Sequence, residues 1–554
     1  MISEQAPKLD SSLEASESLL VEAMRRPEFY PDHPSRVEVR QTHMSYVFLA
    51  GEYVYKVKKP VHFDFADCST LGVRYELCRD EVRLNRRLAP AVYLGVWPII
   101  RDGRRFLLGK ESRSFDPRSQ EYAIKMRRLP DDRMLDRMWR AGQVNVAMID
   151  GLVKRLVGFH QSASTAEGWR YGSAPAVRRT VLGNLDESER FAGYTLTNSQ
   201  FAAIEDYLKG FVSAHWELLN DRMRQGHVRD GHGDLRCEHI CLAQGVQIFD
   251  CLEFSERLRY GDVASDIAFL AMDLDSLGAS PLADELVHAY AQATADESFA
   301  TLTNFYKCHR ACVRGKVESL KSLEDEVPSV ERDSARDHAR GSFSLAFGYA
   351  LRGRPALVIV CGLSGTGKST VARMLQSRTG FELLSSDRIR KRLAGVPETA
   401  SASAPYGAGI YSAGFDHLTY DALLADARAR LREGCGVIID ATFIRPEDRR
   451  SVLAIGAQAG VPVLFVECQA DEREILRRLG ERTKKGDSVS DATAEVYLSQ
   501  RAEFVPITEV RARHHLIIDT GENIERALER IEGSLGSLFQ PSRKESASGG
   551  CHES

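Results

Sequence analysis

A glycine-rich segment in the second half of the chain has the residue types that hold the phosphate groups of a nucleotide. It fits G-x-x-x-x-G-K-[ST] at every fixed position. Glycines let the backbone bend so that its N–H groups face phosphate oxygens, and the start of the following helix adds partial positive charge. We expect Lys368 to reach the β and γ phosphates and Ser369 to offer its hydroxyl to Mg²⁺. The expected nucleotide-binding residues are Gly362, Leu363, Ser364, Gly365, Thr366, Gly367, Lys368, Ser369 and Thr370.

The residues on either side of this segment have the patterns of a strand and a helix. Residues 357–360 form an apolar β run, and residues 371–380 have helical spacing that ends at a glycine. A chance glycine-rich turn would lack this context. The sequence therefore predicts a phosphate-binding loop that uses ATP and Mg²⁺ as cofactors.

Two carboxylates follow later predicted strands. Asp387 comes after a β run at 383–386, where it can accept a proton from an attacking hydroxyl, and Arg390 can hold an anionic group on the acceptor. The alternative is a helix N-cap at Asp387 and a surface arginine at Arg390. Asp440 ends a buried strand and suits a ligand of Mg²⁺ or of its bound water.

Four arginines lie close together in one short helical stretch. They are Arg473, Arg477, Arg478 and Arg482, of which the last two are four residues apart and share a helix face. Guanidinium groups near a nucleotide predict a lid that closes over the transferring phosphoryl group. The alternative is a solvated charged face.

The first half of the chain carries a different pair of acids. An HGD motif ends at Asp234, and Asp250 follows sixteen residues later at the end of an apolar run. Phosphoryl transfer needs a base near the acceptor hydroxyl and a carboxylate on Mg²⁺, and these two residues can supply them. We expect Asp266, at the start of a helix, to accept N–H groups of the HGD loop and hold it rigid. Each acid taken alone is equally well explained as structural.

The patterns around these acids predict two lobes. Residues 37–98 show strand-like alternation interrupted by a helix at 79–88, and residues 121–130 alternate as a further strand. The pattern after residue 138 is mostly helical. We therefore expect a small mixed lobe followed by a helical lobe.

On these motifs, residues 35–320 resemble the aminoglycoside phosphotransferase and choline-kinase branch of the protein-kinase-like fold. The resemblance implies that Lys56, with Lys58 as a near rival, binds the nucleotide phosphates. It also implies that Glu81, with Glu76 as second choice, pairs with that lysine. Asp234 would be the catalytic base and Asp250 a metal ligand.

One position departs from that family. The family has a metal-binding Asn five residues after the catalytic Asp, and this chain has His239 there. A neutral imidazole is a poorer partner than an amide oxygen for a hard ion such as Mg²⁺. Three interpretations follow: one metal held by Asp250, altered metal binding that includes His239, or weak phosphotransfer.

Residues 355–535 resemble P-loop kinases of the polynucleotide-kinase, zeta-toxin and gluconate-kinase type. The resemblance rests on GLSGTGKST, LLSSDRIRKRL, VIIDATF and RRLGERTKKGDSVSDAT, in that order. It implies that Asp387 is the general base, that Arg390 contacts the acceptor, and that Arg478 and Arg482 come from the lid.

The expected fold class is α/β and α+β, with a two-lobed protein-kinase-like fold followed by a P-loop NTPase fold that has a parallel sheet flanked by helices. We expect an N-terminal extension at 1–34, a kinase-like domain at 35–322 and a helical linker at 323–354. A P-loop domain at 355–539 and a disordered tail at 540–554 complete the chain.

Composition excludes several classes of protein. The 554 residues include 74 Lys and Arg against 78 Asp and Glu, and this near balance argues against a protein that coats nucleic acid through its overall charge. No apolar stretch approaches the length of a membrane span, and the N-terminus lacks a signal-peptide pattern. We expect a cytoplasmic protein with no membrane partner.

Together these observations predict an ATP-dependent phosphotransferase that acts on a hydroxyl of a small molecule, with the P-loop domain as the main active site and a second kinase-like ATP site in the first half. Two alternatives remain open. In one, the first half is a pseudokinase-like module that binds a ligand and regulates the P-loop enzyme. In the other, the chain is a polynucleotide 5′-hydroxyl kinase, which its charge does not favour.

Overall fold

The structure is a computed structural model in which the chain forms two compact units. One unit contains residues 1–179 and 214–307, and the other contains residues 180–213 and 308–554. The structure describes residues 11–63, 66–103, 105–325, 327–352, 354–397, 409–485 and 493–539. The expected C-terminal tail lies outside these residues.

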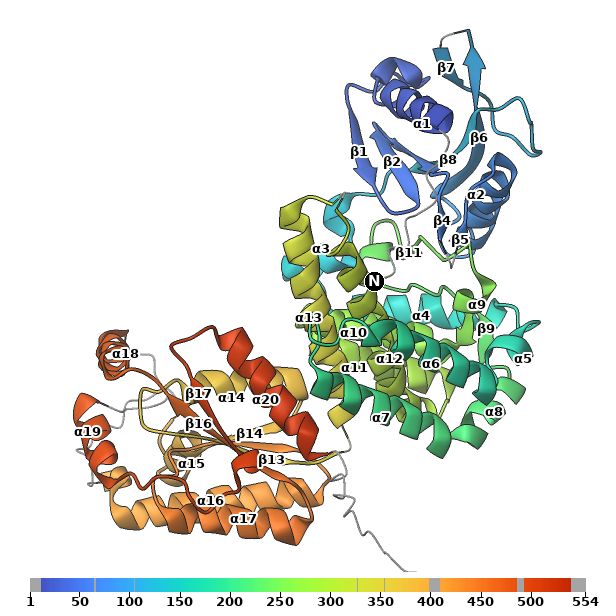
Figure 1. The fold of residues 1–554 in the computed structure, drawn as a ribbon. Coiled ribbons are helices and arrows are strands. Elements are labelled where there is room, and N and C mark those ends of the chain that lie inside the picture. Colours follow the sequence, from blue (N-terminus) through green and yellow to red (C-terminus); the bar gives the residue numbers. More distant parts are fainter. Residues whose placement is uncertain are drawn as a thin grey trace, which may run out of the picture. The chain divides into compact units, whose positions relative to one another are not determined.

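The first unit begins with an antiparallel sheet of six strands in the order β1-β2-β3-β8-β6-β7 (Figure 1). Side chains alternate between the faces of a strand, so Lys56 and Lys58 face one side and Tyr55 and Val57 the other. Helix α1 packs with Tyr55 and Val57, whereas α2 packs with Ile124, the residue paired with Lys56. The two lysines therefore face the α2 side of the sheet. The elements are α1 (Ser11–Met24), β1 (Val37–Gln41), β2 (Ser45–Ala50), β3 (Tyr53–Lys58), α2 (Leu71–Asn85), β6 (Tyr93–Asp102), β7 (Arg105–Leu108) and β8 (Glu121–Arg127).

A mostly helical lobe follows, in which short strand pairs carry the loops. Strand β9 (Val228–Asp230) pairs with β12 (Tyr260–Asp262), and β10 (Ile240–Cys241) pairs with β11 (Gln247–Ile248). A further pair, β4 (His62–Phe63) and β5 (Ala66–Asp67), lies just before α2. The helices are α3 (Leu135–Arg140), α4 (Val146–Ser162), α5 (Gly168–Tyr171), α6 (Ala174–Glu189), α8 (Trp216–Arg224), α9 (Glu256–Arg259), α10 (Val263–Ser276), α11 (Ser280–Thr294) and α12 (Phe299–Lys321).

The second unit is built around a five-stranded parallel sheet in the order β14-β15-β13-β16-β17. Its central strands are buried apolar runs, as expected for a sheet covered on both faces. Helices α14 and α20 lie on one face, and α16 and α17 lie on the other (Figure 1). The strands are β13 (Leu357–Cys361), β14 (Glu382–Ser385), β15 (Val437–Asp440), β16 (Val463–Gln469) and β17 (His515–Asp519). The helices are α14 (Lys368–Thr379), α15 (Ser386–Leu393), α16 (Ala413–Arg432), α17 (Pro446–Ala459), α18 (Glu472–Lys485), α19 (Ala494–Glu503) and α20 (Ile524–Leu538).

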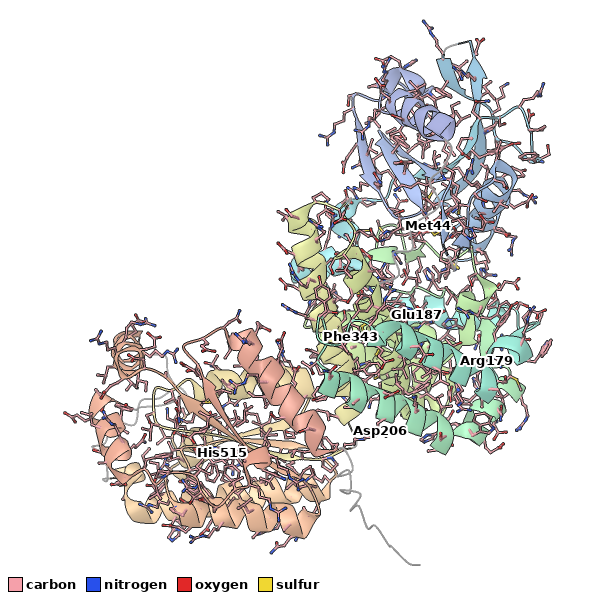
Figure 2. The ribbon with its side chains drawn as sticks, in the orientation of Figure 1. Met44, Arg179, Glu187, Asp206, Phe343 and His515 are labelled. Atoms are coloured by element: carbon pink, nitrogen blue, oxygen red, sulfur yellow. The ribbon has the colours of Figure 1, made fainter. Side chains whose placement is uncertain are left out.

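Helices that precede the sheet in the sequence belong to the same unit. They are α6 from Thr180 onward, α7 (Asn198–Ala214), α12 from Cys308 onward, and α13 (Ser329–Leu351). Phe343 of α13, which Figure 2 labels, packs over Gly315 of α12. Fully buried Glu532 of α20 accepts hydrogen bonds from Gln200 of α7 and from Arg378 of α14.

The fold class expected from the sequence is confirmed, because a small sheet-rich lobe, a helical lobe and a parallel α/β sheet occur in that order. The two contact-defined units divide the chain differently from the expected domains, since 180–213 groups with the parallel sheet. The domain boundaries stay a prediction. In the described part of the chain, no helix has both the length and the apolar composition needed to cross a membrane.

The close approach of α13 to α14 gives a stability prediction. A Cβ at Gly348 would overlap the carbonyl oxygen of Arg378, which is backbone and does not move aside easily. We expect Gly348→Ala to lower the free energy of unfolding by about 1–3 kcal/mol. Gly341→Ala on the same helix is the matched control, because nothing lies within 4 Å of its Cβ. It should stabilise the helix by about 0.5–1 kcal/mol, and denaturant unfolding that ranked the two variants alike would contradict the close contact.

Candidate active sites

The glycine-rich loop of the second unit lies between β13 and α14. Its glycines at 362, 365 and 367 all have positive φ, at +126°, +84° and +87°. A Cβ at Gly367 would meet Thr520 Oγ1 at 3.1 Å and Arg478 Nη1 at 3.2 Å. Glycine is therefore required both by conformation and by space. Lys368 Nζ crosses the loop and donates to the carbonyl oxygen of Leu363 at 2.8 Å, so its ammonium group lies over the loop.

The parallel sheet brings the predicted acids to this loop. Strands β13, β14 and β15 are neighbours, and parallel strands present their carboxyl ends at one edge. At that edge Asp440 lies close to Ser369, whose hydroxyl favours the ionised form of the carboxylate. Burial raises the pKa of Asp440, the charge of Lys368 opposes the rise, and that of Asp387 adds to it. The four side chains thus interact electrostatically at one place.

This donor set fits Mg²⁺. A serine hydroxyl and a carboxylate supply hard oxygen ligands, and Mg²⁺ usually completes its shell with substrate phosphates and water. Ser369 and Asp440 are the residues that would hold the ion. Asp387 lies near enough to influence Asp440, and its role as the base stays a prediction.

The arginines of α18 have separate surroundings. Arg478 Nε donates to Glu474 at 2.7 Å, and its Nη1 donates to Thr520 Oγ1 at 3.0 Å, beside Gly367. Arg477 is exposed and pairs with Glu474 and Glu481, which matches a solvated face. The side chain of Arg482 lies outside the described residues. Only Arg478 is placed at the loop among the described arginines of this helix.

Arg390 contacts the protein itself. It is 8% exposed, forms an ion pair with Asp416 of α16, and donates to the carbonyl oxygen of Ile410 at 2.9 Å. These contacts join α15 to the start of α16. Its role as an acceptor contact stays a prediction.

Sequence reasoning missed two residues that hold the loop. Gln500 of α19 accepts a hydrogen bond from the backbone N–H of Ser364 at 2.9 Å. Thr520, directly after β17, donates to the carbonyl oxygen of Thr366 at 2.7 Å. Both lie more than 130 residues from the loop, at separations of 136 and 154. The sequence signal for Thr520 was its position as a polar residue just past the last strand of the parallel sheet.

The first unit holds a second candidate site, in which one glutamate meets both lysines of β3. Lys56 Nζ lies 2.9 Å from Glu81 Oε1 and donates to Asp250 Oδ1 at 2.7 Å. Lys58 Nζ donates to Glu81 Oε2 at 2.8 Å and to Glu253 at 2.5 Å. The structure thus places Lys56, rather than Lys58, beside Asp250. Glu76 is exposed and pairs with Arg79, so Glu81 is the partner of the lysines.

Asp250 sits in an unusual backbone conformation. Its φ is +63°, in the left-handed region that side chains other than glycine rarely adopt. Burial raises the pKa of its carboxyl, but the charges of Lys56 and His239 outweigh burial and hold that pKa well below its ordinary value. Asp250 therefore stays ionised at neutral pH.

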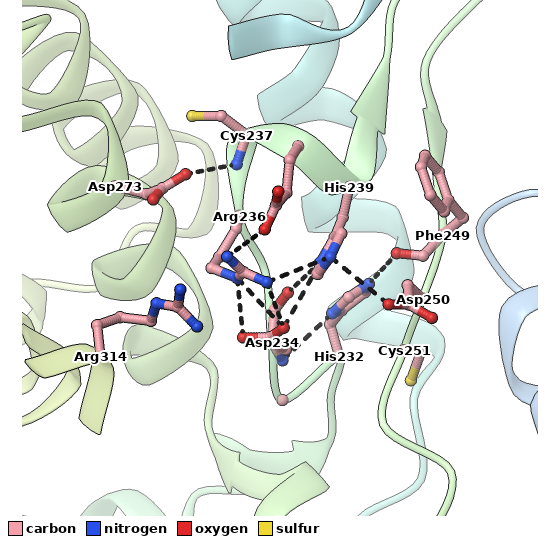
Figure 3. Close-up of polar contacts among 12 residues, drawn as sticks. His232, Asp234, Arg236, Cys237, His239, Phe249, Asp250, Cys251, Asp273 and Arg314 are labelled. Carbon is pink, nitrogen blue, oxygen red and sulfur yellow. Dashed lines mark hydrogen bonds and ion pairs between the residues drawn. The ribbon is translucent and has the colours of Figure 1, made fainter. Parts of the chain in front are cut away.

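Asp266 anchors the HGD loop as expected. Its carboxylate accepts the N–H of His232 at 2.7 Å and the N–H of Gly233 at 3.0 Å. His232 Nε2 lies 3.0 Å from the carbonyl oxygen of Phe249, just before Asp250 (Figure 3). Since that oxygen is an acceptor, Nε2 carries the proton, and the ring links the two acid-bearing segments.

Asp234 is held by a residue that the sequence did not single out. Arg236 Nε lies 3.1 and 3.2 Å from the two carboxylate oxygens of Asp234. His239 Nδ1 lies 2.9 Å from the backbone carbonyl of Asp234, and its Nε2 lies 3.6 Å from Asp250 Oδ2 (Figure 3). The site therefore brings together Asp234, His239 and Asp250, with Arg236 as an added cation.

The parallel sheet and the loop at Ser369 define the second unit as a P-loop, kinase-like domain. A family model described as an AAA domain matches residues 357–507. The uncharacterised protein Rv2004c of Mycobacterium tuberculosis is 32% identical over 507 residues, which cover 91% of this chain and 95% of that protein. An uncharacterised protein of Mycobacterium bovis matches equally well. The chain belongs to the same family as these mycobacterial proteins.

Several solved structures are similar to parts of the chain. A choline/ethanolamine kinase family protein from Mesorhizobium loti is 13% identical, with a TM-score of 0.35, over 60% of this chain and 99% of that one. A gluconokinase from Sinorhizobium meliloti is 17% identical, with a TM-score of 0.24, over 34% of this chain and 95% of that one. With both TM-scores below 0.5, neither similarity assigns a substrate to this chain.

The bond from Ser364 to Gln500 gives a binding prediction. We expect Gln500→Ala to weaken ATP binding about tenfold, because a buried N–H left without an acceptor costs roughly 1–3 kcal/mol. Gln500→Glu keeps an acceptor oxygen and should bind ATP nearly as well as the parent chain. Leu498→Ala, at a position 52% exposed on the same helix, is the control. If calorimetric titration gave all three variants equal affinity for ATP, Gln500 would have no part in the site.

The buried His232 gives a pH prediction. Burial lowers its pKa to about 4, below the 6.5 of a free histidine. The unfolded chain therefore binds more protons between these values, so stability is full above pH 6.5 and falls by about 3 kcal/mol as the pH drops to 4. His232→Gln removes this titration and should flatten the fall of Tm with pH. Identical pH slopes for the two proteins would show that the ring is not buried as a neutral group.

Proposed function

We propose that this chain is an ATP-dependent phosphotransferase that moves the γ-phosphate of ATP to a hydroxyl of a small molecule. Its main active site is the P-loop of the second unit, and the first unit carries a second kinase-like ATP site. The observation that carries the proposal is the Lys368 ammonium over the glycine-rich loop, with Asp440 at the carboxyl end of the neighbouring strand. This arrangement supports a phosphate-binding cation and a metal-binding acid at one edge of the sheet, beside Asp387.

Each group has a distinct part in the reaction. Backbone N–H groups of the loop and the ammonium of Lys368 bind the phosphates and hold the γ-phosphorus in place. Ser369 and Asp440 would hold Mg²⁺, which would neutralise charge on the phosphate oxygens. Asp387 accepts the proton of the acceptor hydroxyl, whose oxygen forms the new bond to phosphorus as the bond to ADP breaks. Arg478, beside Gly367, stabilises charge that spreads over the transferred group.

The net charge of −4 supports a small acceptor over a polyanion. The experiment is a screen of the full chain with γ-labelled ATP, a panel of hydroxyl metabolites and 5′-hydroxyl oligonucleotides. Label on a metabolite identifies the acceptor. Label on the oligonucleotide instead would make the chain a polynucleotide kinase, and release of phosphate alone over the whole panel would reduce it to an ATPase.

The first unit has a second candidate role, as a ligand-binding module that controls the P-loop site. This role is favoured by the ion pair between Asp234 and Arg236, because it engages the carboxylate that was expected to act as the catalytic base. If a chain with an inactive P-loop still transferred phosphate to an acceptor, the first unit would be more than a regulatory module.

Lys368 provides the decisive variant. We expect Lys368→Ala to lower ATP turnover by the full chain at least about 100-fold, because a cation aimed at the transferring phosphate is lost. Lys209→Ala is the control, since Lys209 is 49% exposed and pairs with Glu205 on its own helix. Turnover measured by release of labelled phosphate should be unchanged in that control. Retained turnover in Lys368→Ala would refute the P-loop as the main active site.

A further inference from the structure

Arg236 contacts two residues of the kinase-like site in the first unit, the expected catalytic acid and the histidine that follows it. Its Nε lies 3.1 and 3.2 Å from the two carboxylate oxygens of Asp234, and its Nη2 lies 3.4 Å from Nε2 of His239 (Figure 3). A guanidinium group in a protein is not deprotonated. The site therefore carries a permanent positive charge beside His239.

The lone pair of the His239 ring is used within the protein. Nδ1 lies 2.9 Å from the backbone carbonyl oxygen of Asp234, which only accepts, so Nδ1 carries the ring proton. Nε2 is then the acceptor, and Nη2 of Arg236 donates to it. An imidazole bonded in this way offers no lone pair to a metal ion.

Asp250 also meets positive charge. Its Oδ1 accepts a hydrogen bond from Lys56 at 2.7 Å, and its Oδ2 faces Nε2 of His239 at 3.6 Å. An ion beside Oδ2 would lie next to the nitrogen that Arg236 contacts, and the guanidinium charge would repel it. Mg²⁺ needs a near-octahedral shell of oxygens, and no group of three or more metal-ligating side chains occurs in the described parts of the chain. The residues of this site therefore do not fit Mg²⁺.

The same cations suit the oxygens of a phosphate group. A lysine has three N–H donors, and the hydrogen bond to Asp250 uses one of those of Lys56. The planar fork of an arginine matches phosphate geometry. The side chain of Asp250 is 42% exposed, so a ligand can reach this part of the site. Lys56 and Arg236 thus flank the facing pair of Asp250 and His239 with N–H donors.

We propose that the first unit binds the phosphates of its nucleotide through Lys56 and Arg236, without a divalent metal ion. The proposal rests on the nucleotide site proposed for this unit. Phosphoryl transfer uses metal ions that bridge the β and γ phosphate oxygens. A nucleotide bound without such an ion is held rather than consumed, which agrees with a regulatory role for the first unit.

The test uses the full chain with Lys368→Ala and Ser369→Ala, which disable the P-loop site. The probe is a non-hydrolysable ATP analogue, titrated by calorimetry with Mg²⁺ and again with the metal removed by a chelator. We expect the two dissociation constants to agree within about twofold. Arg236→Ala should weaken binding about tenfold under both conditions, because a charge-assisted hydrogen bond to phosphate is lost. Arg224→Ala is the control and should change neither constant, since Arg224 is exposed and pairs with Asp221 on its own helix.

A double variant tests why the metal is excluded. His239→Asn combined with Arg236→Ala supplies an amide oxygen and removes the repelling charge. This variant should bind the analogue at least about tenfold more tightly with Mg²⁺ than without it. Thermal unfolding checks that each variant is folded. A double variant indifferent to Mg²⁺ would contradict the part assigned to these two residues.

Tenfold tighter binding with Mg²⁺ in the parent background would overturn the proposal and leave the nucleotide site standing. A lack of binding under both conditions would overturn the nucleotide site of the first unit as well. Neither result bears on the P-loop function, which is tested by turnover of the chain with Lys368 intact.

Discussion

Among the described residues, buried acids at both sites are stabilised by opposite charges, and both sites depend on that constraint. Glu81 is fully buried and meets two lysines of one strand. Glu532 is fully buried and meets Arg378, on the helix that starts at the P-loop. In each unit a buried acid thus fixes the element that carries the cations proposed to bind phosphate. The fold itself holds these cations, which would reduce the ordering that a ligand must cause.

The sequence predicted those parts of the sites that depend on local pattern. The P-loop could be read from its spacing, because its glycines and lysine act within one turn between a strand and a helix. Asp440 could be placed because an acid at the end of a buried parallel strand lies at a known edge of the sheet. Asp266 was expected to bind the N–H groups of the HGD loop, and it accepts two of them.

Other parts depend on contacts between distant segments and could not be read from the sequence. Lys56 and Lys58 are two residues apart on one strand, so alternation places both on the same face. Their separate contacts, with Asp250 and with Glu253, distinguish them. Gln500 and Thr520 reach the P-loop from helices and loops far along the chain. Arg236 looked like an ordinary charged residue, and its role follows from the fold of the loop around Asp234.

The close contact between Gly348 and Arg378 also bears on how such a chain can evolve. The helix that contains Gly348 comes before the P-loop sheet, yet its apolar residues Phe343 and Phe347 are fully buried in the same unit. Gln200, which comes still earlier in the chain, also donates a hydrogen bond to Glu532 of α20. A gene rearrangement that transferred the P-loop segment from residue 355 onward would leave these surfaces uncovered. The segment that can be transferred as a unit is therefore larger than its nucleotide-binding motif suggests. A rearrangement that joins the P-loop sheet to another domain must carry along the helices that precede the sheet.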